Sequence, residues 1–136
     1  MSRLAFVFPG QGSQEVGMLQ DDYEAGNIVA KTFDEASSAL GYDLWALTQN
    51  GPVEQLNQTE FTQPALLAAS IALWRLANEQ SLPAIDVVAG HSLGEYSALV
   101  AAEVIAFSDT AKLVQKRGQF MQTAVWRAWL CHAADR

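Results

Sequence analysis

The segment spanning residues 85–104 constrains the fold more than any other part of the chain. A short apolar run at residues 85–89 leads into residues 90–94, which read Gly-His-Ser-Leu-Gly, and a stretch dense in alanine and leucine follows. This order predicts a strand, a sharp turn and a helix. It is typical of a nucleophile elbow, in which a serine lies at the apex of the turn. We therefore expect an α/β fold organised around Ser92.

The chemistry of such a turn explains its residue types. A serine at the apex needs a strained backbone and close contact between neighbouring segments, and Gly90 and Gly94 relieve the crowding because they lack a Cβ. The first N–H groups of the following helix point toward the serine, where they can stabilise negative charge on a substrate oxygen. The N–H of Leu93 is the first of these donors. Ser92 is thus a candidate nucleophile, and a purely structural Gly-Ser turn is the alternative.

Composition narrows the possible classes of function. The 136 residues allow one ordinary domain, and 50% hydrophobic against 17% charged residues indicates a packed core. The net charge of −7 argues against a nucleic-acid partner, because it leaves no dense basic surface. No apolar run approaches the roughly 20 residues of a membrane span, so no membrane partner is expected. The single cysteine, Cys131, excludes an internal disulfide and suits a cytoplasmic location.

A glycine-rich loop follows the first apolar run. Residues 4–8 predict a strand that is buried on both faces of a parallel sheet. Residues 9–14 then read Pro-Gly-Gln-Gly-Ser-Gln, and loops at the carboxyl ends of strands are where ligands bind in open α/β folds. A tight turn without a ligand is the alternative. The loop lacks the lysine of a Walker loop and the third glycine of a dinucleotide fingerprint.

The segments between the two strands predict helices. We expect them over residues 22–40, after Asp43, over residues 53–56 and over residues 62–80. The last of these is apolar on nearly all sides, which predicts a helix buried behind the sheet. Gln63 lies at its mouth, where it either faces a site or caps the helix.

A final helix, beginning near Phe107 with Ser108 or Asp109 as its cap, carries an unusual arginine. Helical spacing places Arg117 in the middle of an apolar stripe. The stripe consists of Leu113, Phe120, Met121 and Ala124. A guanidinium directed at the core needs an anion, because an unpaired buried charge is costly. Position alone leaves open an internal carboxylate, outward snorkelling, or a substrate carboxylate held by two hydrogen bonds.

Four ordered motifs give the chain a strong resemblance to the malonyl-CoA:acyl carrier protein transacylases of bacterial fatty-acid synthesis. The motifs are residues 6–14, residues 62–66, residues 90–98 and the pair Arg117-Gly118. The resemblance covers about residues 3–125. It implies an α/β fold: the N-terminal part of the α/β-hydrolase-like large subdomain of the acyltransferase fold, without the ferredoxin-like subdomain.

The resemblance also implies a reaction and roles for particular residues. Ser92 matches the serine that is malonylated, and the backbone N–H groups of Gln11 and Leu93 match the oxyanion hole. Arg117 matches the arginine that binds the free carboxylate of malonate. The implied reaction is ping-pong: malonyl-CoA acylates Ser92, and the phosphopantetheine thiol of acyl carrier protein then takes the acyl group. It requires no cofactor or metal beyond these substrates.

The remaining implied roles concern the walls of the site and its base. Gln63 matches a glutamine that lines the site. His91 adjoins Ser92, and its side chain leaves the turn in another direction, so we expect a packing residue or a substrate-binding wall residue there rather than the base. His132, in the terminal segment, is not expected to be the base either. The base histidine of the family lies well beyond residue 136, so it is absent from this chain.

The end of the chain departs from the family pattern. Residues 126–136 lack the proline, glycine-rich turn and Met-x-Ala strand with which the family continues. We therefore expect a partial acyltransferase large subdomain over residues 1–125 and an aberrant, out-of-frame tail over residues 126–136. A genuine amphipathic helix is the alternative. Without its base, the chain is expected to be weakly active or inactive, and a polyketide-synthase-type acyltransferase or a non-catalytic fragment are the rival interpretations.

Overall fold

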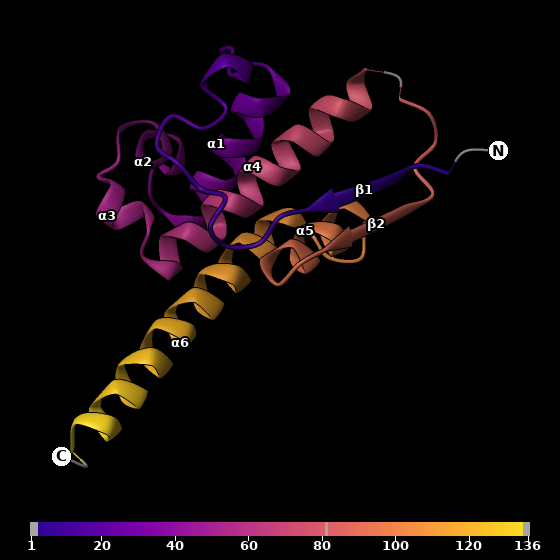
Figure 1. Cartoon of the computed structure of the whole chain (residues 1–136). Helices are drawn as coiled ribbons and strands as arrows, with labels where there is room; N and C mark the ends of the chain where they lie inside the picture. Colours follow the sequence, from indigo (N-terminus) through magenta and orange to yellow (C-terminus); the bar gives the residue numbers. More distant parts are fainter. Residues whose placement is uncertain (1–2, 81, 135–136) are drawn as a thin grey trace.

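Two parallel strands and a set of helices make up the chain (Figure 1). The structure is a computed structural model that describes residues 3–80 and 82–134, with side-chain environments up to residue 125. The elements are β1 (Ala5–Phe8), the 3-10 helix η1 (Gln20–Asp22), α1 (Ile28–Leu40), α2 (Leu44–Asn50), α3 (Val53–Leu56), α4 (Thr59–Glu79), β2 (Val87–Gly90), α5 (Leu93–Ala101) and α6 (Phe107–Ala134). The predicted α/β class, with its parallel strands, is confirmed.

The two strands form a ribbon with one covered and one open face. Their register pairs Ala5 with Val87 at one end and Phe8 with Gly90 at the other. Phe6 lies on the covered face, where its ring contacts the ring of Trp74 of α4 edge-on at 5.0 Å. On the other face the side chain of Val7 is 67% exposed. The prediction that the first strand is buried on both faces is therefore wrong, because no described segment covers this valine.

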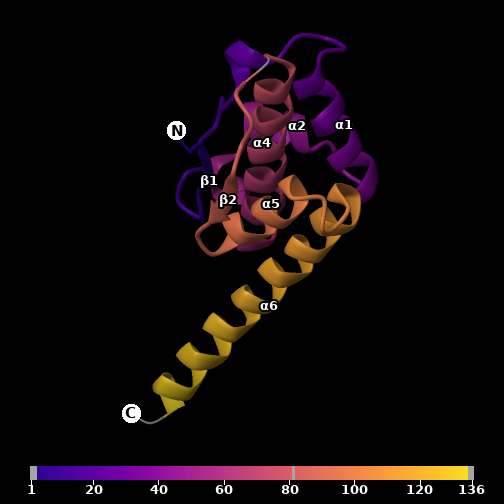
Figure 2. The same cartoon turned by 90° about the vertical axis from the view of Figure 1, so that its right-hand side faces the viewer.

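Helix α4 forms the centre of the helical core. Residues 62–72 are all buried, which confirms the prediction of a helix that is apolar on nearly all sides. Figure 2 shows α4 between the two strands and the pair α1 and α2. Helix α4 also packs against α5 and α6. It therefore connects the helices that precede β2 in the sequence with those that follow it.

Local sequence signals fix most helix ends, and α1 shows where one was missed. The predicted start near residue 22 is wrong, because Gly26 takes a left-handed φ of 82° and the chain turns there. Asn27 then caps α1 by accepting a hydrogen bond from the N–H of Ala30 at 2.9 Å. Gly41 ends α1 with a φ of 83°, as predicted, and Asp43 caps α2.

Helix α6 begins as predicted but exposes a different face. It starts at Phe107, so the predicted caps Ser108 and Asp109 lie in its first turn instead. The apolar stripe is not in the core: Leu113 is 48% exposed and Phe120 is 65% exposed. The buried positions are instead Phe107, Thr110, Ala111, Val114 and Gly118.

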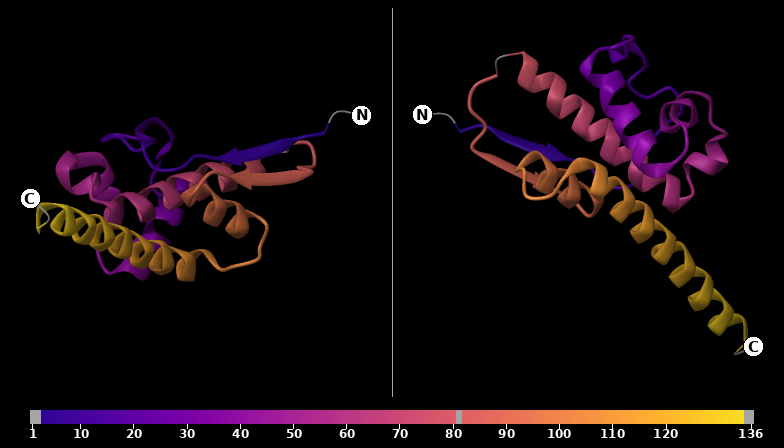
Figure 3. Two further views of the ribbon diagram at one scale, coloured as in Figure 1. Left: turned by 60° about the horizontal axis from the view of Figure 1, so that its bottom comes forward. Right: turned by 180° about the vertical axis from the view of Figure 1, so that it is seen from behind.

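The reason for this exposure is the course of α6. Its buried positions face α4 and α1, so Leu113 and Phe120 lie on the opposite side, and beyond them the helix projects away from the rest of the described chain (Figures 1 and 3). The backbone remains helical to Ala134. The side chains of Cys131 and His132 lie outside the described set, and the out-of-frame origin of residues 126–136 stays a prediction. No helix within the described residues is long and apolar enough to cross a membrane.

One buried hydroxyl in the helical core gives a prediction about stability. The Tyr42 hydroxyl has no hydrogen-bond partner among the described residues, and its ring contacts Phe61 edge-on at 5.6 Å. Tyr42→Phe removes an unsatisfied polar atom while keeping the ring. We expect the variant to be more stable by about 1 kcal/mol in urea unfolding at pH 8.

The pH dependence of that difference supplies a check. Burial, and then the charge of Glu60, raise the pKa of Tyr42 above its usual value. The stability contributed by the neutral phenol is thus fully present below the unfolded pKa of about 10 and lost as the pH rises above it. The advantage of Tyr42→Phe should grow between pH 8 and pH 11. Tyr23→Phe is the control, and an equal growth for both variants would contradict the assignment.

Candidate functional site

Ser92 lies at the turn between β2 and α5 in a strained backbone conformation. Its φ is 53° and its ψ is −110°, a combination that residues other than glycine rarely adopt. A Cβ at Gly90 would overlap the carbonyl group of Gly94, and a Cβ at Gly94 would overlap the carbonyl oxygen of Phe8. The predicted strand, turn and helix are confirmed. The two glycines are required because three backbone segments meet at this serine.

The guanidinium of Arg117 is hydrogen-bonded to the Ser92 hydroxyl. Its Nη2 donates a hydrogen bond to the Ser92 Oγ at 3.1 Å. Its Nη1 donates to the Oε1 of Gln63 at 2.5 Å. Its Cζ lies 5.5 Å from the centroid of the Tyr96 ring, a cation–π contact from the same helix that follows the serine. Helices α4, α5 and α6 thus meet at this one arginine.

The hydrogen bonds continue from Gln63 to the glycine-rich loop. The Gln63 side chain is completely buried, and its Nε2 donates to the Oε1 of Gln11 at 3.1 Å. Four side chains therefore form one hydrogen-bonded chain from Ser92 through Arg117 and Gln63 to Gln11. The two ends of this hydrogen-bonded chain, Gln11 and Ser92, are 81 positions apart in the sequence.

The charge of Arg117 is not neutralised by a carboxylate. Both of its hydrogen-bond acceptors are neutral side chains. Within the described part of the chain, the ion pair that is found joins Arg75 to Glu35 at 2.9 Å and does not involve Arg117. The position of Arg117 in the sequence left three arrangements open. The first of them, an ion pair with an internal carboxylate, is wrong for the described residues. Snorkelling is wrong as well, because the guanidinium points at Ser92.

The other predicted site residues surround the serine. His91 is exposed, and a Cβ at Gly10 would come within 2.9 Å of its Nδ1, while the described hydrogen bonds of Ser92 include none to this ring. Its own N–H donates to the carbonyl of Phe8 at 3.2 Å, which holds the turn to the end of β1. The N–H groups of Gln11 and Leu93 have no hydrogen-bond acceptor among the described residues. Both donors therefore remain available to a bound oxygen atom.

Two residues that matter for the geometry were quoted only as members of motifs and were given no role from the sequence. A Cβ at Gly118 would come within 2.7 Å of the Cα of Glu60, so this glycine lets α6 approach the first turn of α4. That approach brings the neighbouring Arg117 within reach of Gln63. A glycine inside a helical pattern was the available signal for close packing. Tyr96 carried no comparable signal.

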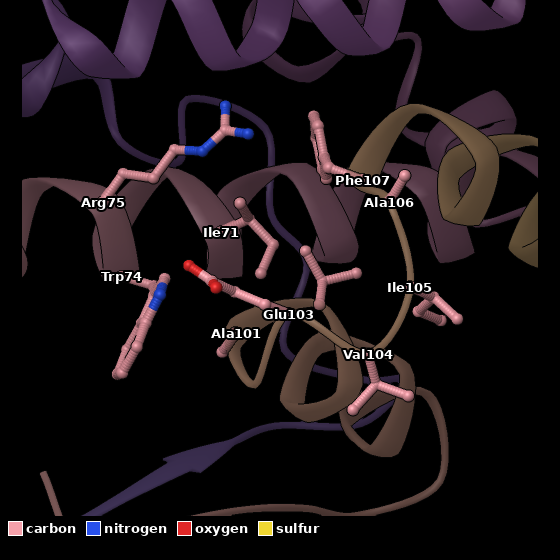
Figure 4. Close-up of a pocket in the computed structure, with 10 residues that line it drawn as sticks. Ile71, Trp74, Arg75, Ala101, Glu103, Val104, Ile105, Ala106 and Phe107 are labelled. Carbon is pink, nitrogen blue, oxygen red and sulfur yellow. The ribbon is translucent and has the colours of Figure 1, made fainter.

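The cavity shown in Figure 4 is separate from the site at Ser92. It has a volume of about 450 Å³ and is lined by residues of α4 and of the α5–α6 connection, including Trp74, Arg75 and Glu103. Ser92 is not among its lining residues. Nor do the described residues hold a group of three or more His, Cys, Asp or Glu side chains suited to a metal ion. The candidate site is therefore defined by the hydrogen-bonded chain at Ser92 rather than by cavity volume.

Comparison with known proteins identifies the family. The acyl transferase domain matches residues 5–128. The chain belongs to the acyl transferase domain family. The malonyl CoA-acyl carrier protein transacylase of Escherichia coli K12 is 63% identical to this acyl transferase chain over 125 residues, which are 92% of the chain and 40% of that enzyme. The Bacillus subtilis enzyme of the same name is 48% identical, with 92% and 39% covered.

Solved structures agree with this assignment. An acyl carrier protein S-malonyltransferase from Vibrio cholerae is 62% identical with a TM-score of 0.85, covering 90% of this chain and 40% of that one. A malonyl-transacylase in complex with its type II PKS acyl-carrier protein is 59% identical with a TM-score of 0.87, again covering 90% and 40%. The chain thus spans about 40% of the length of its relatives and matches their N-terminal part. The predicted family and fold are confirmed.

Proposed function

We propose that Ser92 accepts a malonyl group from malonyl-CoA and that acyl carrier protein then removes it. In the first step the Ser92 Oγ forms a bond to the thioester carbonyl carbon, the carbon–sulfur bond breaks, and coenzyme A leaves as the thiol with the serine proton. In the second step the phosphopantetheine thiol attacks the ester and restores the hydroxyl. The N–H groups of Gln11 and Leu93 stabilise the oxyanion in both steps.

The position of Arg117 is the observation that carries this proposal. Its Nη2 lies 3.1 Å from the attacking oxygen, and no carboxylate of the described chain neutralises it. A malonyl group carries its free carboxylate one methylene from the reacting carbonyl, so an acyl group on Ser92 brings that carboxylate close to Arg117. A guanidinium recognises such a carboxylate through two parallel hydrogen bonds. A neutral acyl group has no carboxylate with which the Arg117 guanidinium could form an ion pair.

The described site lacks a general base that could take the proton of Ser92. Within the described side chains, Ser92 has a hydrogen bond from Arg117, which is a donor, and none to a group that could take its proton. The family resemblance implies a base histidine in a region that this chain does not match. We therefore propose that the chain forms the acyl-enzyme slowly. In a serine protease that lacks a triad member, the remaining groups still give roughly 10³- to 10⁴-fold catalysis over water.

The partners follow from the same proposal. They are malonyl-CoA and an acyl carrier protein, in the cytoplasm, where a chain with a single cysteine stays reduced. Membership of a type II polyketide pathway is the alternative, favoured by the similarity to the malonyl-transacylase solved with such a carrier protein. Rates of malonyl transfer to carrier proteins of the two pathways separate these possibilities.

Replacing Arg117 tests the proposed recognition of the carboxylate. Wild-type chain and Arg117→Ala are incubated separately with malonyl-CoA and acetyl-CoA, and the acyl adduct is followed by intact-mass measurement. A charged hydrogen bond is worth about 1.5–3 kcal/mol, so we expect the malonyl preference to fall by about 10- to 100-fold. Arg75→Ala is the matched control, because Arg75 is held by Glu35. An unchanged preference in Arg117→Ala would contradict the proposal.

A further inference from the structure

The side chain of Gln11 ends the hydrogen-bonded chain that begins at Ser92. The proposed oxyanion donor at this position is the backbone N–H, which leaves the side-chain amide without an assigned role. That amide accepts the Nε2 hydrogen bond of Gln63 at 3.1 Å, although Gln11 itself lies in an exposed loop. An exposed loop residue is thus bonded to a completely buried side chain of another element.

The donors and acceptors along this chain allow one arrangement. Arg117 can only donate, so the oxygen of the Gln63 amide must face it. The nitrogen of the same amide must then point the other way, where it needs an acceptor because Gln63 is completely buried. The Oε1 of Gln11 is that acceptor. Without it, the Nε2 of Gln63 would be a buried donor with no acceptor among the described residues.

We propose that the Gln11 side chain is a positioning residue that fixes the Gln63 amide and, through it, Arg117. This inference rests on the proposed function, in which Arg117 binds the substrate carboxylate. A neutral amide at position 63 directs the guanidinium without neutralising it, whereas a carboxylate there would compete with the substrate. Gln11 therefore keeps the charge of Arg117 both oriented and available.

The same arrangement links the two halves of substrate recognition. Gln11 carries the proposed oxyanion N–H on its backbone and the anchor of Gln63 on its side chain. When a carboxylate draws Arg117 toward itself, the change reaches the oxyanion loop through two hydrogen bonds. Binding of the carboxylate and stabilisation of the oxyanion are thus coupled, which favours acylation by acyl groups that carry a carboxylate.

Side-chain NMR of the full chain tests the positioning role without requiring turnover. In ¹⁵N-labelled protein, Gln11→Met should raise the hydrogen-exchange rate of the Gln63 side-chain amide by about fivefold, because the bond lost is worth about 1 kcal/mol. Gln11→Glu keeps an acceptor and should restore the protection. Gln80→Met, at an exposed helix end, is the matched control and should change nothing. If Gln11→Met does not fold, Gln11→Asn, which is one methylene shorter, replaces it.

Binding of malonate then separates this inference from the proposed function. Titration with malonate, followed through the Arg117 Nε–H signal, should show an affinity about five- to tenfold weaker in Gln11→Met and unchanged in Gln80→Met. If Arg117→Ala abolishes binding but Gln11→Met leaves both the affinity and the Gln63 exchange unchanged, the positioning role is overturned and the proposed function stands. If malonate binds equally to wild type and Arg117→Ala, the proposed function is overturned, while the exchange measurement still decides the contact between Gln11 and Gln63.

Discussion

Replacing Ser92 with alanine is expected to remove the malonyl adduct completely while leaving the fold intact. Alanine keeps the Cβ, so the strained backbone at this turn, with φ at 53°, is the same in both proteins. The only atom lost is the Oγ that Arg117 contacts at 3.1 Å and that forms the bond to the acyl carbon. Intact-mass measurement after incubation with malonyl-CoA should show no mass increase.

Two companion variants separate the chemistry from the strain. Ser97→Ala removes from α5, the helix that follows the elbow, a buried hydroxyl that has no partner in the described part of the chain, and it should keep the adduct. Ser92→Gly should lose the adduct yet be more stable than Ser92→Ala by about 1–3 kcal/mol, because glycine relieves the strained conformation. An adduct that persists in Ser92→Ala would show another nucleophile. Its removal by hydroxylamine at neutral pH would indicate a thioester at Cys131.

The parts of this protein that the sequence predicted well are those encoded locally. The elbow, for example, follows from an apolar run, two glycines and an alanine-rich segment within 20 residues, so neighbouring positions carry the whole signal. The same holds for the caps at Asp43 and Gly41, where one side chain or one left-handed backbone ends a helix. Burial of α4 followed from its composition.

The parts that were missed depend on which elements meet in space. The stripe at Leu113 and Phe120 is apolar in any helical projection, but burial requires a neighbour, and the described chain gives α6 none along that face. The bond between Gln63 and Gln11 joins residues 52 positions apart, and no periodicity relates them. Arg117 was found because a charge on an apolar stripe is anomalous, whereas Gly118, which brings it to the site, signals only close packing.

Replacing Gly94 with alanine is expected to destabilise the protein strongly, because the added Cβ would overlap backbone atoms of a neighbouring segment. Gly94 is the second residue of α5, and a Cβ there would overlap the carbonyl oxygen of Phe8 and lie 2.9 Å from that of Pro9. Neither oxygen belongs to a flexible side chain, so α5 must move away from β1. Overpacking of this kind costs about 3 kcal/mol, a large share of a typical total of about 5–15 kcal/mol.

A comparison of two glycines shows whether the close approach itself is responsible. Gly41→Ala places a Cβ in open space but at a left-handed φ of 83°, so it measures backbone strain alone, at about 1 kcal/mol. Urea unfolding should therefore rank wild type above Gly41→Ala and Gly41→Ala above Gly94→Ala. Only Gly94→Ala should also slow malonyl acylation, because moving α5 displaces Ser92 and the Leu93 N–H from Arg117. A Gly94→Ala variant as stable as Gly41→Ala would mean that β1 and α5 are not in contact at the elbow, and that the strand does not hold the nucleophile in place.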